Sequence, residues 1–299
     1  MKANPSALEP LDVRLLRRLL NGWPFTRGKG TIMRLARPFL DRRDFVMQIE
    51  PGIVAVPDLD DRILHWCFVD GSGSWDPIMH LSRAIIRPGD TLLDVGANVG
   101  LWVMGAARRA GGSARVVAFE PVPDNLRRLR GNLALNGLSS VVCEQLALAD
   151  RSGSARFFAA TNSNSGMGSL ATHDGADHAI DVRMTTLDSY CDAVGIDSIA
   201  VVKVDVEGAE RLVFEGGRRR LARDDGPAIM FEVNEELAAL FGSSTVSVKR
   251  LLGDFGYRIF RFDGRALHEV RKEEHHSGED LIAFKPTHFS RLALPPIAQ

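Results

Sequence analysis

Four acidic residues, Asp94, Glu120, Asp205 and Glu232, each stand at the end of an apolar run of the sequence. Short apolar runs of this kind are typical of buried strands, and in an open parallel sheet ligands bind at the carboxyl ends of the strands. Carboxylates are costly to bury unless they are paired or functional. The sequence therefore predicts a binding or proton-accepting site at one edge of a sheet.

The segment IAVVKVDVEGAE, residues 199–210, concentrates this chemistry. Lys203 and Asp205 are two positions apart, so on a strand they share one face. We predict that Asp205 or Glu207 accepts a proton and that Lys203 pairs with this carboxylate or orients it. The carboxylates could instead hold a divalent cation such as Mg²⁺. No full ligand set can be read, so this version is less favoured and no residue is assigned to a metal.

A glycine-rich turn follows the first of these apolar runs, in TLLDVGANVG, Thr91–Gly100, and the amphipathic stretch LWVMGAARRA comes next. This order predicts a strand, a loop and a helix. Gly96 and Gly100 allow a sharp turn and close approach of a ligand, and the free N–H groups of the helix attract an anionic group. Asp94 adds a negative charge at the same turn. A site of both signs suits a zwitterion, and S-adenosylmethionine fits it.

A dinucleotide is the competing ligand, because its fingerprint is G-x-G-x-x-G after a strand. Asn98 occupies a position where that fingerprint has glycine, and an acid precedes the first glycine, so the loop departs from it twice. Glu120 lies about twenty residues after the loop, where an acid can accept both ribose hydroxyls. Both cofactors carry a ribose, so Glu120 does not separate them. An NAD-dependent oxidoreductase and a non-catalytic cofactor-binding module remain alternatives.

The elements that must position these residues alternate between strands and helices. Strands are expected at 91–95, 115–119, 141–148, 155–160, 199–204, 228–234, 257–264 and 280–286, and helices after residues 100, 122 and 208 and around 248–255. The end of the third strand, Gln145 to Ala149, should lie near an adenine. Residues 160–180 are rich in Asn, Ser, Gly and His, which predicts a loop over the sheet edge. His173 and His178 lie in it and are expected to be solvated.

The motifs DVGANVG, AFEP and VKVDVEGAE, with TTLDSYC upstream of the last, are similar to those of the FkbM family of S-adenosylmethionine-dependent methyltransferases. The similarity runs from about Asp76 to Asn234. It implies a Rossmann-like class I methyltransferase fold, an α/β fold with a seven-stranded, mostly parallel sheet and helices on both faces. It also implies O-methylation of a hydroxyl on a sugar, a glycan or a polyketide-like natural product.

The resemblance also implies roles for individual residues. The methionine end would be held by Asp94, Gly96, Asn98 and Gly100, and the ribose by Glu120. The other predicted cofactor-binding residues are Ala97, Pro121, Ala147 and Asp205. Asp205 would lie close to the methyl group and the acceptor. Asp205, Glu207 and Lys203 are then the candidate catalytic residues.

Composition narrows the remaining classes of protein. The chain has 299 residues, 45% of them hydrophobic, and a formal net charge of −1, which gives no case for nucleic-acid binding and counts against a nucleic-acid methyltransferase. Three scattered cysteines indicate neither a zinc site nor a disulfide framework, which suits the cytoplasm. No apolar run approaches the ~20 residues of a membrane span, and no signal peptide is evident.

Three segments are expected: a cap over residues 1–80, the methyltransferase domain over 81–290 and a tail over 291–299. In the cap, Leu8, Leu11, Leu15 and Leu19 line one face of a basic helix that should dock by this face and leave its arginines solvated. Binding of the basic residues to a membrane surface or an anionic partner is the less favoured alternative. FVMQIEPGIVAVPD and RILHWCFVDG are expected to form a β-hairpin. The cap would cover the active-site edge or mediate a homo-oligomer contact. Trp66 and Trp75 could line an acceptor pocket, although ordinary packing is favoured.

Overall fold

The computed structural model describes residues 9–23, 27–41, 45–57, 59, 62–70, 77–159 and 178–298. The chain divides into two compact units, with the boundary between Asp76 and Pro77. His173, Trp75 and the side chain of Trp66 lie outside the described part, as does the predicted 160–180 loop up to position 177. Residues 178–180 were expected in that loop, but they begin a strand. The three-segment division at residues 80 and 290 stays a prediction.

The first unit contains helices and a small hairpin. Its elements are α1 (Leu11–Gly22), α2 (Lys29–Leu40), β1 (Met47–Glu50), β2 (Ile53–Ala55) and α3 (Arg62–Asp70). The predicted hairpin is wrong in its second half, because both strands lie within residues 47–55 and RILHWCFVD is helix α3. The reason is visible in the buried side chains, since Leu64, Cys67 and Phe68 recur at helical spacing.

Helix α1 buries a different face from the one expected. Val13 and Leu20 are fully buried, whereas Leu11, Leu15 and Leu19 are 68%, 55% and 50% exposed. Arg17, on the same helix, forms an ion pair with Glu9 at 2.8 Å. The leucine face is therefore not the one that packs α1 within the described structure, and a homo-oligomer contact through this region stays a prediction.

An eight-stranded sheet forms the centre of the second unit, in the order β12-β11-β13-β10-β9-β3-β4-β5. Its strands are β3 (Thr91–Val95), β4 (Arg115–Phe119), β5 (Val142–Glu144), β9 (Val201–Val204), β10 (Ala228–Val233), β11 (Arg258–Phe262), β12 (Leu267–Glu269) and β13 (Glu279–Phe284). Strands β5, β4, β3, β9 and β10 are parallel neighbours, and β13, β11 and β12 pair antiparallel. The predicted α/β fold with a mostly parallel sheet is confirmed, with β12 as one strand beyond the expected seven.

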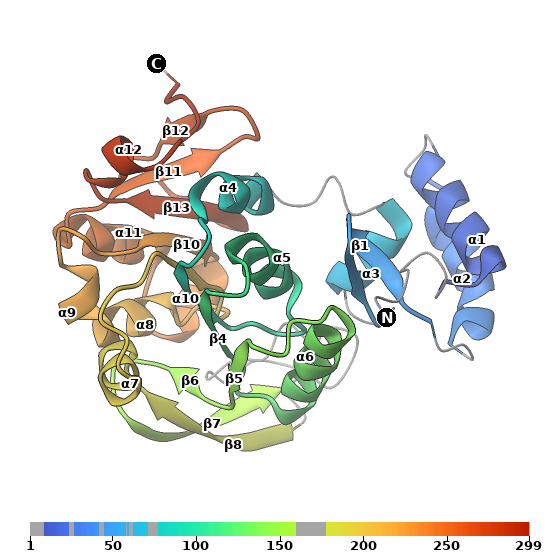
Figure 1. The fold of residues 1–299 in the computed structure, drawn as a ribbon, viewed down its shortest axis with the longest axis horizontal. Helices are drawn as coiled ribbons and strands as arrows, with labels where there is room; N and C mark the ends of the chain where they lie inside the picture. Colours follow the sequence, from blue (N-terminus) through green and yellow to red (C-terminus); the bar gives the residue numbers. More distant parts are fainter. Residues whose placement is uncertain are drawn as a thin grey trace. The chain divides into compact units, whose positions relative to one another are not determined.

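Helices cover both faces of this sheet (Figure 1). They are α4 (Pro77–Ile85), α5 (Leu101–Ala110), α6 (Pro123–Leu135), α7 (Leu187–Val194), α8 (Glu210–Gly216), α9 (Arg218–Leu221), α10 (Glu235–Leu240), α11 (Thr245–Asp254) and α12 (His288–Arg291). Alternation of side chains along the strands separates the two faces. One face packs against α4 and α5, where the hydroxyl of Ser82 lies 3.4 Å from the sulfur of Met230.

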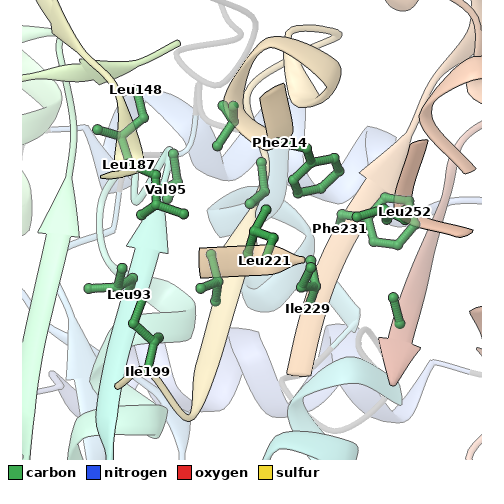
Figure 2. Packing of buried hydrophobic residues seen from close by; sticks show 14 of the residues in the cluster. Leu93, Val95, Leu148, Leu187, Ile199, Phe214, Leu221, Ile229, Phe231 and Leu252 are labelled. Atoms are coloured by element: carbon green, nitrogen blue, oxygen red, sulfur yellow. The ribbon is translucent and has the colours of Figure 1, made fainter. Parts of the chain in front are cut away.

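The main hydrophobic core lies on the other face, under α7, α8, α9 and α11 (Figure 2). Strands β3 and β10 contribute alternating residues to it, such as Leu93, Val95 and Phe231, and the rings of Phe231 and Phe214 pack edge to face. The side chains between these core positions point to the α4 and α5 face. Because of the same alternation, the side chains of Asp94 and Lys203 point away from this core.

A second sheet of three strands corrects the predicted third strand. Residues 141–148 do not form one strand, because β5 ends at Glu144 and β6 (Ala147–Leu148) pairs with β8 (His178–Thr185). Strand β7 (Gly153–Ala159), which corresponds to the predicted strand at 155–160, pairs antiparallel with β8. An apolar run does not specify which sheet it joins, so the break at Gln145 and Leu146 could not be read from it.

The residues after α12 return to the sheet. The N–H of Leu267 in β12 donates to the carbonyl of Pro296 at 2.8 Å, and the N–H of Ala298 donates to the carbonyl of Leu267 at 2.9 Å.

Within the described ranges, no helix has both the length and the apolar character needed to cross a membrane.

Candidate active site

Two loops meet at the carboxyl edge of the central sheet. The glycine loop, residues 96–100, follows β3, and the acidic loop, residues 205–209, follows β9. The N–H of Asp205 donates to the carbonyl of Val95 at 2.9 Å. A Cβ atom on Gly96 would lie 1.8 Å from the carbonyl oxygen of Asp205, and the φ of Gly96 is +82°. Only glycine fits here, so the turn brings the two sequence motifs into direct contact.

Glu120 holds the glycine loop in place. Its Oε2 accepts the N–H of Asn98 at 2.8 Å and its Oε1 accepts the N–H of Val122 at 2.9 Å. The side chain is only 4% exposed, and burial raises its pKa to about 7 even though these two N–H groups lower it. The structure therefore shows Glu120 at the loop, as expected, and gives it a structural bond that the sequence did not reveal. Its predicted contact with a ribose stays a prediction.

Asp94 is a buried carboxylate without a hydrogen-bond partner among the described residues. It is 1% exposed, and neither of its oxygens makes a hydrogen bond, although the N–H of Val103 lies near enough to lower its pKa slightly. Burial raises the pKa of Asp94 to about 6, against the opposing charge of Lys203. A buried polar group that lacks a partner is costly. Asp94 thus offers two free acceptor oxygens, which suit the ammonium group of a cofactor.

Lys203 and Asp205 form the ion pair that their spacing indicated. The Nζ of Lys203 lies 2.8 Å from Oδ2 of Asp205, and the two side chains are 13% and 33% exposed. Burial lowers the pKa of Lys203, but the charges of Asp205 and Asp94 outweigh it and raise the pKa. Burial likewise opposes ionisation of Asp205, yet the ammonium group of Lys203 holds its pKa below the ordinary value. Asp205 is therefore ionised and fixed in position.

Glu207 and Glu232 complete a cluster with Asp205. One carboxylate oxygen from each of the three lies within 4.8 Å of the others. The register of β10 against β9 places Glu232 beside Asp205. Burial, together with the charges of Asp205 and Glu207, raises the pKa of Glu232. Three carboxylates at this separation could share a divalent cation, but Lys203 already neutralises one of them. The suggested metal stays an untested prediction.

Asp280 is a further acid of this cluster that sequence reasoning missed. It lies on β13 directly opposite Glu232 on β10. Its side chain is exposed to solvent, and partial desolvation by its neighbours together with the charge of Asp205 raises its pKa. The positive charge of Lys203 on β9 lowers the pKa of Asp280. The register that brings Asp280 on β13 across from Glu232 on β10 could not be read from the sequence. The available signal was an acid pair, Glu279 and Asp280, at the start of an apolar run.

The acidic loop is fixed by its own backbone. Glu210, 3% exposed, accepts the N–H groups of Val206 and Gly208 at 3.3 and 3.1 Å. Glu207 has a φ of +54°, which L-residues rarely adopt. A Cβ atom on Gly208 would lie 2.4 Å from the backbone of Leu237 in α10. The carboxylate of Glu207 is therefore displayed from a tightly constrained turn.

The structure brings together most of the residues predicted for the site. Gly100 begins α5 with a φ of +94°, and a Cβ there would lie 2.5 Å from Leu129. Ala97 is buried within the glycine loop, and Pro121 follows Glu120 directly. Ala147 differs, because it lies in β6 of the small sheet and packs with Ala149, Val182 and Met184. Its predicted contact with the cofactor stays a prediction.

The pattern of the Methyltransferase FkbM domain family matches residues 94–259. Among curated relatives, the 31-O-demethyl-FK506 methyltransferase FkbM of Streptomyces tacrolimicus is 31% identical over 159 residues, covering 44% of this chain and 60% of that protein. The 2-O-methyltransferase NoeI of Sinorhizobium fredii is 28% identical over 154 residues, covering 46% and 61%. The AMB antimetabolite synthetase AmbE of Pseudomonas aeruginosa is 32% identical over 175 residues, which is 47% of this chain and 8% of that protein. The matches thus span less than two thirds of each relative.

Two solved structures are similar to this chain in overall arrangement. Precorrin-6y C5,15-methyltransferase from Geobacter metallireducens has a TM-score of 0.40 and 16% sequence identity, over 70% of this chain and 86% of that one. A SAM-dependent O-methyltransferase from Thermotoga maritima has a TM-score of 0.38 and 14% identity, over 78% of this chain and 72% of that one.

Proposed function

Because the chain belongs to the FkbM methyltransferase family, we propose that it transfers the methyl group of S-adenosylmethionine to a hydroxyl oxygen. The observation that carries this proposal is the contact between Gly96 and Asp205. That contact places the free carboxylate of Asp94 and the Lys203–Asp205 ion pair at one edge of the sheet. A site for a cationic cofactor and a proton acceptor thus lie side by side.

The described residues fit the cofactor by charge and by shape. The unpartnered carboxylate of Asp94 suits the ammonium group, and the oxygen Oδ1 of Asn98 is a second buried acceptor that has no partner. The first N–H groups of α5 suit the cofactor's carboxylate. Glu120 lies at the end of β4, where a ribose hydroxyl could add to its two backbone bonds. When bound, the cofactor supplies a methyl group on a positively charged sulfur.

The chain's own contribution is orientation and proton removal. Aligning an acceptor with its reaction partner can lower the barrier by several kcal/mol, and a base adds about 10²- to 10⁴-fold. We propose that Asp205, ionised and held by Lys203, receives the hydroxyl proton, with Glu207 beside it. Hydroxyl acceptors need such a base because their proton must leave as the oxygen gains carbon.

The acceptor class is proposed from the relatives. Two of them are named for methylation of hydroxyl oxygens, at position 31 of FK506 and at a 2-O position. We propose a hydroxyl on a sugar, a glycan or a polyketide-like natural product. The acidic residues of the described cluster would repel an anionic group on the acceptor. This also favours neutral, hydroxyl-rich molecules as acceptors.

Isotope-labelled methyl transfer tests the proposal. The purified chain is incubated with methyl-labelled S-adenosylmethionine and panels of neutral glycans and O-demethylated polyketides, and products are analysed for base-stable methyl ethers. Asp94→Asn should abolish transfer, and Glu236→Gln, which removes an exposed acid from nearby α10, should leave it unchanged. Label found on nitrogen, or binding of NAD in place of S-adenosylmethionine, would refute O-methylation. Transfer lost in EDTA and restored by Mg²⁺ would establish the metal-assisted version.

A further inference from the structure

We propose that Asp205 and Glu232 act as one pair that holds a single proton in the free protein. The pair releases this proton when a cation binds beside it. It then takes up the acceptor's proton as that cationic charge disappears. The inference rests on the proposed function, since the cation is the cofactor's sulfonium group. It adds Glu232 to the residues that take part in the reaction. It also means that the proton affinity of the base changes during the transfer.

The pair stands on the geometry of the strand ends. Met230 on β10 is paired in register with Lys203 on β9, so two positions further along, Glu232 lies beside Asp205. One carboxylate oxygen of Asp205 and one of Glu232 lie within 4.8 Å of each other. Two carboxylates this close repel each other when both are ionised, which favours a proton on one of them. The geometry therefore favours one proton shared by this pair.

The surrounding charges place that proton on Glu232. Lys203 bonds to Asp205 at 2.8 Å, which keeps Asp205 ionised. Two further acids act on Glu232: Glu207 from the acidic loop and Asp280 from the opposite strand β13. Asp94 from β3 adds its charge at the far side of Lys203. Burial and these like charges raise the pKa of Glu232.

The described cluster carries more negative charge than its one ammonium group can offset. Five carboxyl groups, Asp94, Asp205, Glu207, Glu232 and Asp280, lie around Lys203. A cation that binds within about 4–6 Å lowers the pKa of a carboxyl group by roughly 1–3. Arrival of the sulfonium charge therefore favours loss of the proton from Glu232, and the pair becomes an empty proton acceptor.

Methyl transfer then reverses the change. The acceptor's O–H bond breaks and an O–C bond forms, while the C–S bond breaks and its electron pair stays on sulfur. The proton passes to the Asp205–Glu232 pair, so atoms and charge balance without any further reactant. Because the positive charge on sulfur vanishes in the same step, the proton affinity of the pair rises as the proton arrives. The base is weak before the reaction and strong after it.

Calorimetry of cofactor binding tests the proposal without any acceptor. Binding heats of S-adenosylmethionine and of uncharged S-adenosylhomocysteine are measured at pH 7.5 with EDTA, in buffers of different ionisation enthalpy. The dependence of the heat on the buffer gives the protons exchanged. We expect the sulfonium ligand to release about one proton more per site than the neutral ligand.

Two variants identify the residue that supplies this proton. Glu232→Gln keeps the shape but has no proton to lose, so the difference between the two ligands should disappear. Glu236→Gln removes the same charge from an exposed position of α10, and the difference should persist. Should Glu232→Gln fail to bind S-adenosylhomocysteine, Asp205→Asn, which breaks the pair from its other member, replaces it.

The outcomes separate this inference from the proposed function. If neither ligand binds the wild-type protein, the proposed function itself fails. If both bind and release equal numbers of protons, methyl transfer survives and the shared proton is refuted. A difference that persists in Glu232→Gln also refutes it, as does one that appears only when Mg²⁺ replaces EDTA.

Discussion

The glycine loop and the acidic loop meet at one contact, yet they are fixed by different means. In the glycine loop the constraint is space, since Gly96 and Gly100 have no room for a Cβ. The acidic loop is fixed partly by hydrogen bonds from its own N–H groups to Glu210, and its ion pair joins the side chains of Lys203 and Asp205. Shape therefore sets the cofactor side of the site, and charge sets the side of the reaction. Both sides should respond to pH, because burial raises the pKa of Glu120, which holds the glycine loop, to about 7 and also raises the pKa of Glu232 beside Asp205.

Gly96→Ala should produce the largest effect, because it attacks the contact where the loops meet. A Cβ atom 1.8 Å from the carbonyl of Asp205 forces the backbone to move, and we expect a loss of about 4 kcal/mol or more in the free energy of unfolding. Urea denaturation measures it. Gly137→Ala is the matched control, since its φ is +68° but no atom lies within 4 Å, and it should cost about 1–2 kcal/mol. Equal losses would show that backbone conformation, not space, fixes the glycine loop.

Lys203→Met should come next, because it removes the one ammonium group of the cluster. We expect a loss of about 2–3 kcal/mol at pH 8, reduced from the cost of breaking a fully buried pair because Asp205 is a third exposed. The loss should shrink toward pH 5, since Asp94, whose pKa is raised to about 6 by burial, then takes up a proton. Unfolding at both pH values tests this, with Lys203→Arg as the charge-preserving control. A loss independent of pH would mean that Lys203 acts by packing alone.

Asp94→Asn should stabilise the free protein while removing its cofactor. Burial raises the pKa of Asp94 from 3.8 to about 6, so its ionisation costs stability progressively as the pH rises from about 4 to about 6, and the full cost is present above this range. Removing the charge should therefore add about 1–3 kcal/mol to the free energy of unfolding at pH 8, and little at pH 4.

Calorimetry should show at least a tenfold weaker affinity of Asp94→Asn for S-adenosylmethionine, because a charged hydrogen bond contributes about 1.5–3 kcal/mol. A variant that is less stable at pH 8 would show that Asp94 has a partner in the free protein. Asp94 would then help to fix the shape of the cofactor side of the site, as Gly96 and Gly100 do.

Glu207→Asn should have the smallest effect on stability. Asn tolerates a φ of +54° better than Glu does, so thermal unfolding should show a gain of about 0.5–1 kcal/mol. Turnover should fall, since a carboxylate of the cluster is lost. Unchanged turnover would remove Glu207 from the reaction and leave Asp205 and Glu232 as its acids.

Local patterns were read correctly from the sequence. The strand, turn and helix around DVGANVG follow from an apolar run, two glycines and an amphipathic stretch. The pairing of Lys203 with Asp205 follows from the two-residue period of a strand. Each of these depends on residues within about ten positions of one another, where backbone geometry alone decides which side chains share a face.

Features that depend on distant segments were missed. The register of β13 against β10 determines that Asp280 faces Glu232, and no short-range pattern encodes it. The same holds for β6, which leaves the central sheet for β8. In the first unit, the segment RILHWCFVD fits both the alternation of a strand and the spacing of a helix. It forms a helix, which buries Leu64, Cys67 and Phe68. Glu210 is the last residue of the segment IAVVKVDVEGAE, but its bonds to the loop N–H groups depend on the loop's actual conformation.

The return of the chain to β12 bears on how this protein avoids aggregation. Strand β12 is at the outer edge of the central sheet, and an open edge offers unpaired N–H and C=O groups to the strands of other molecules. Residues Pro296 to Ala298 accept from and donate to Leu267 at this edge, and Ile297 pairs with it in parallel. A few residues with little regular structure thus cover groups that would otherwise recruit a neighbouring chain.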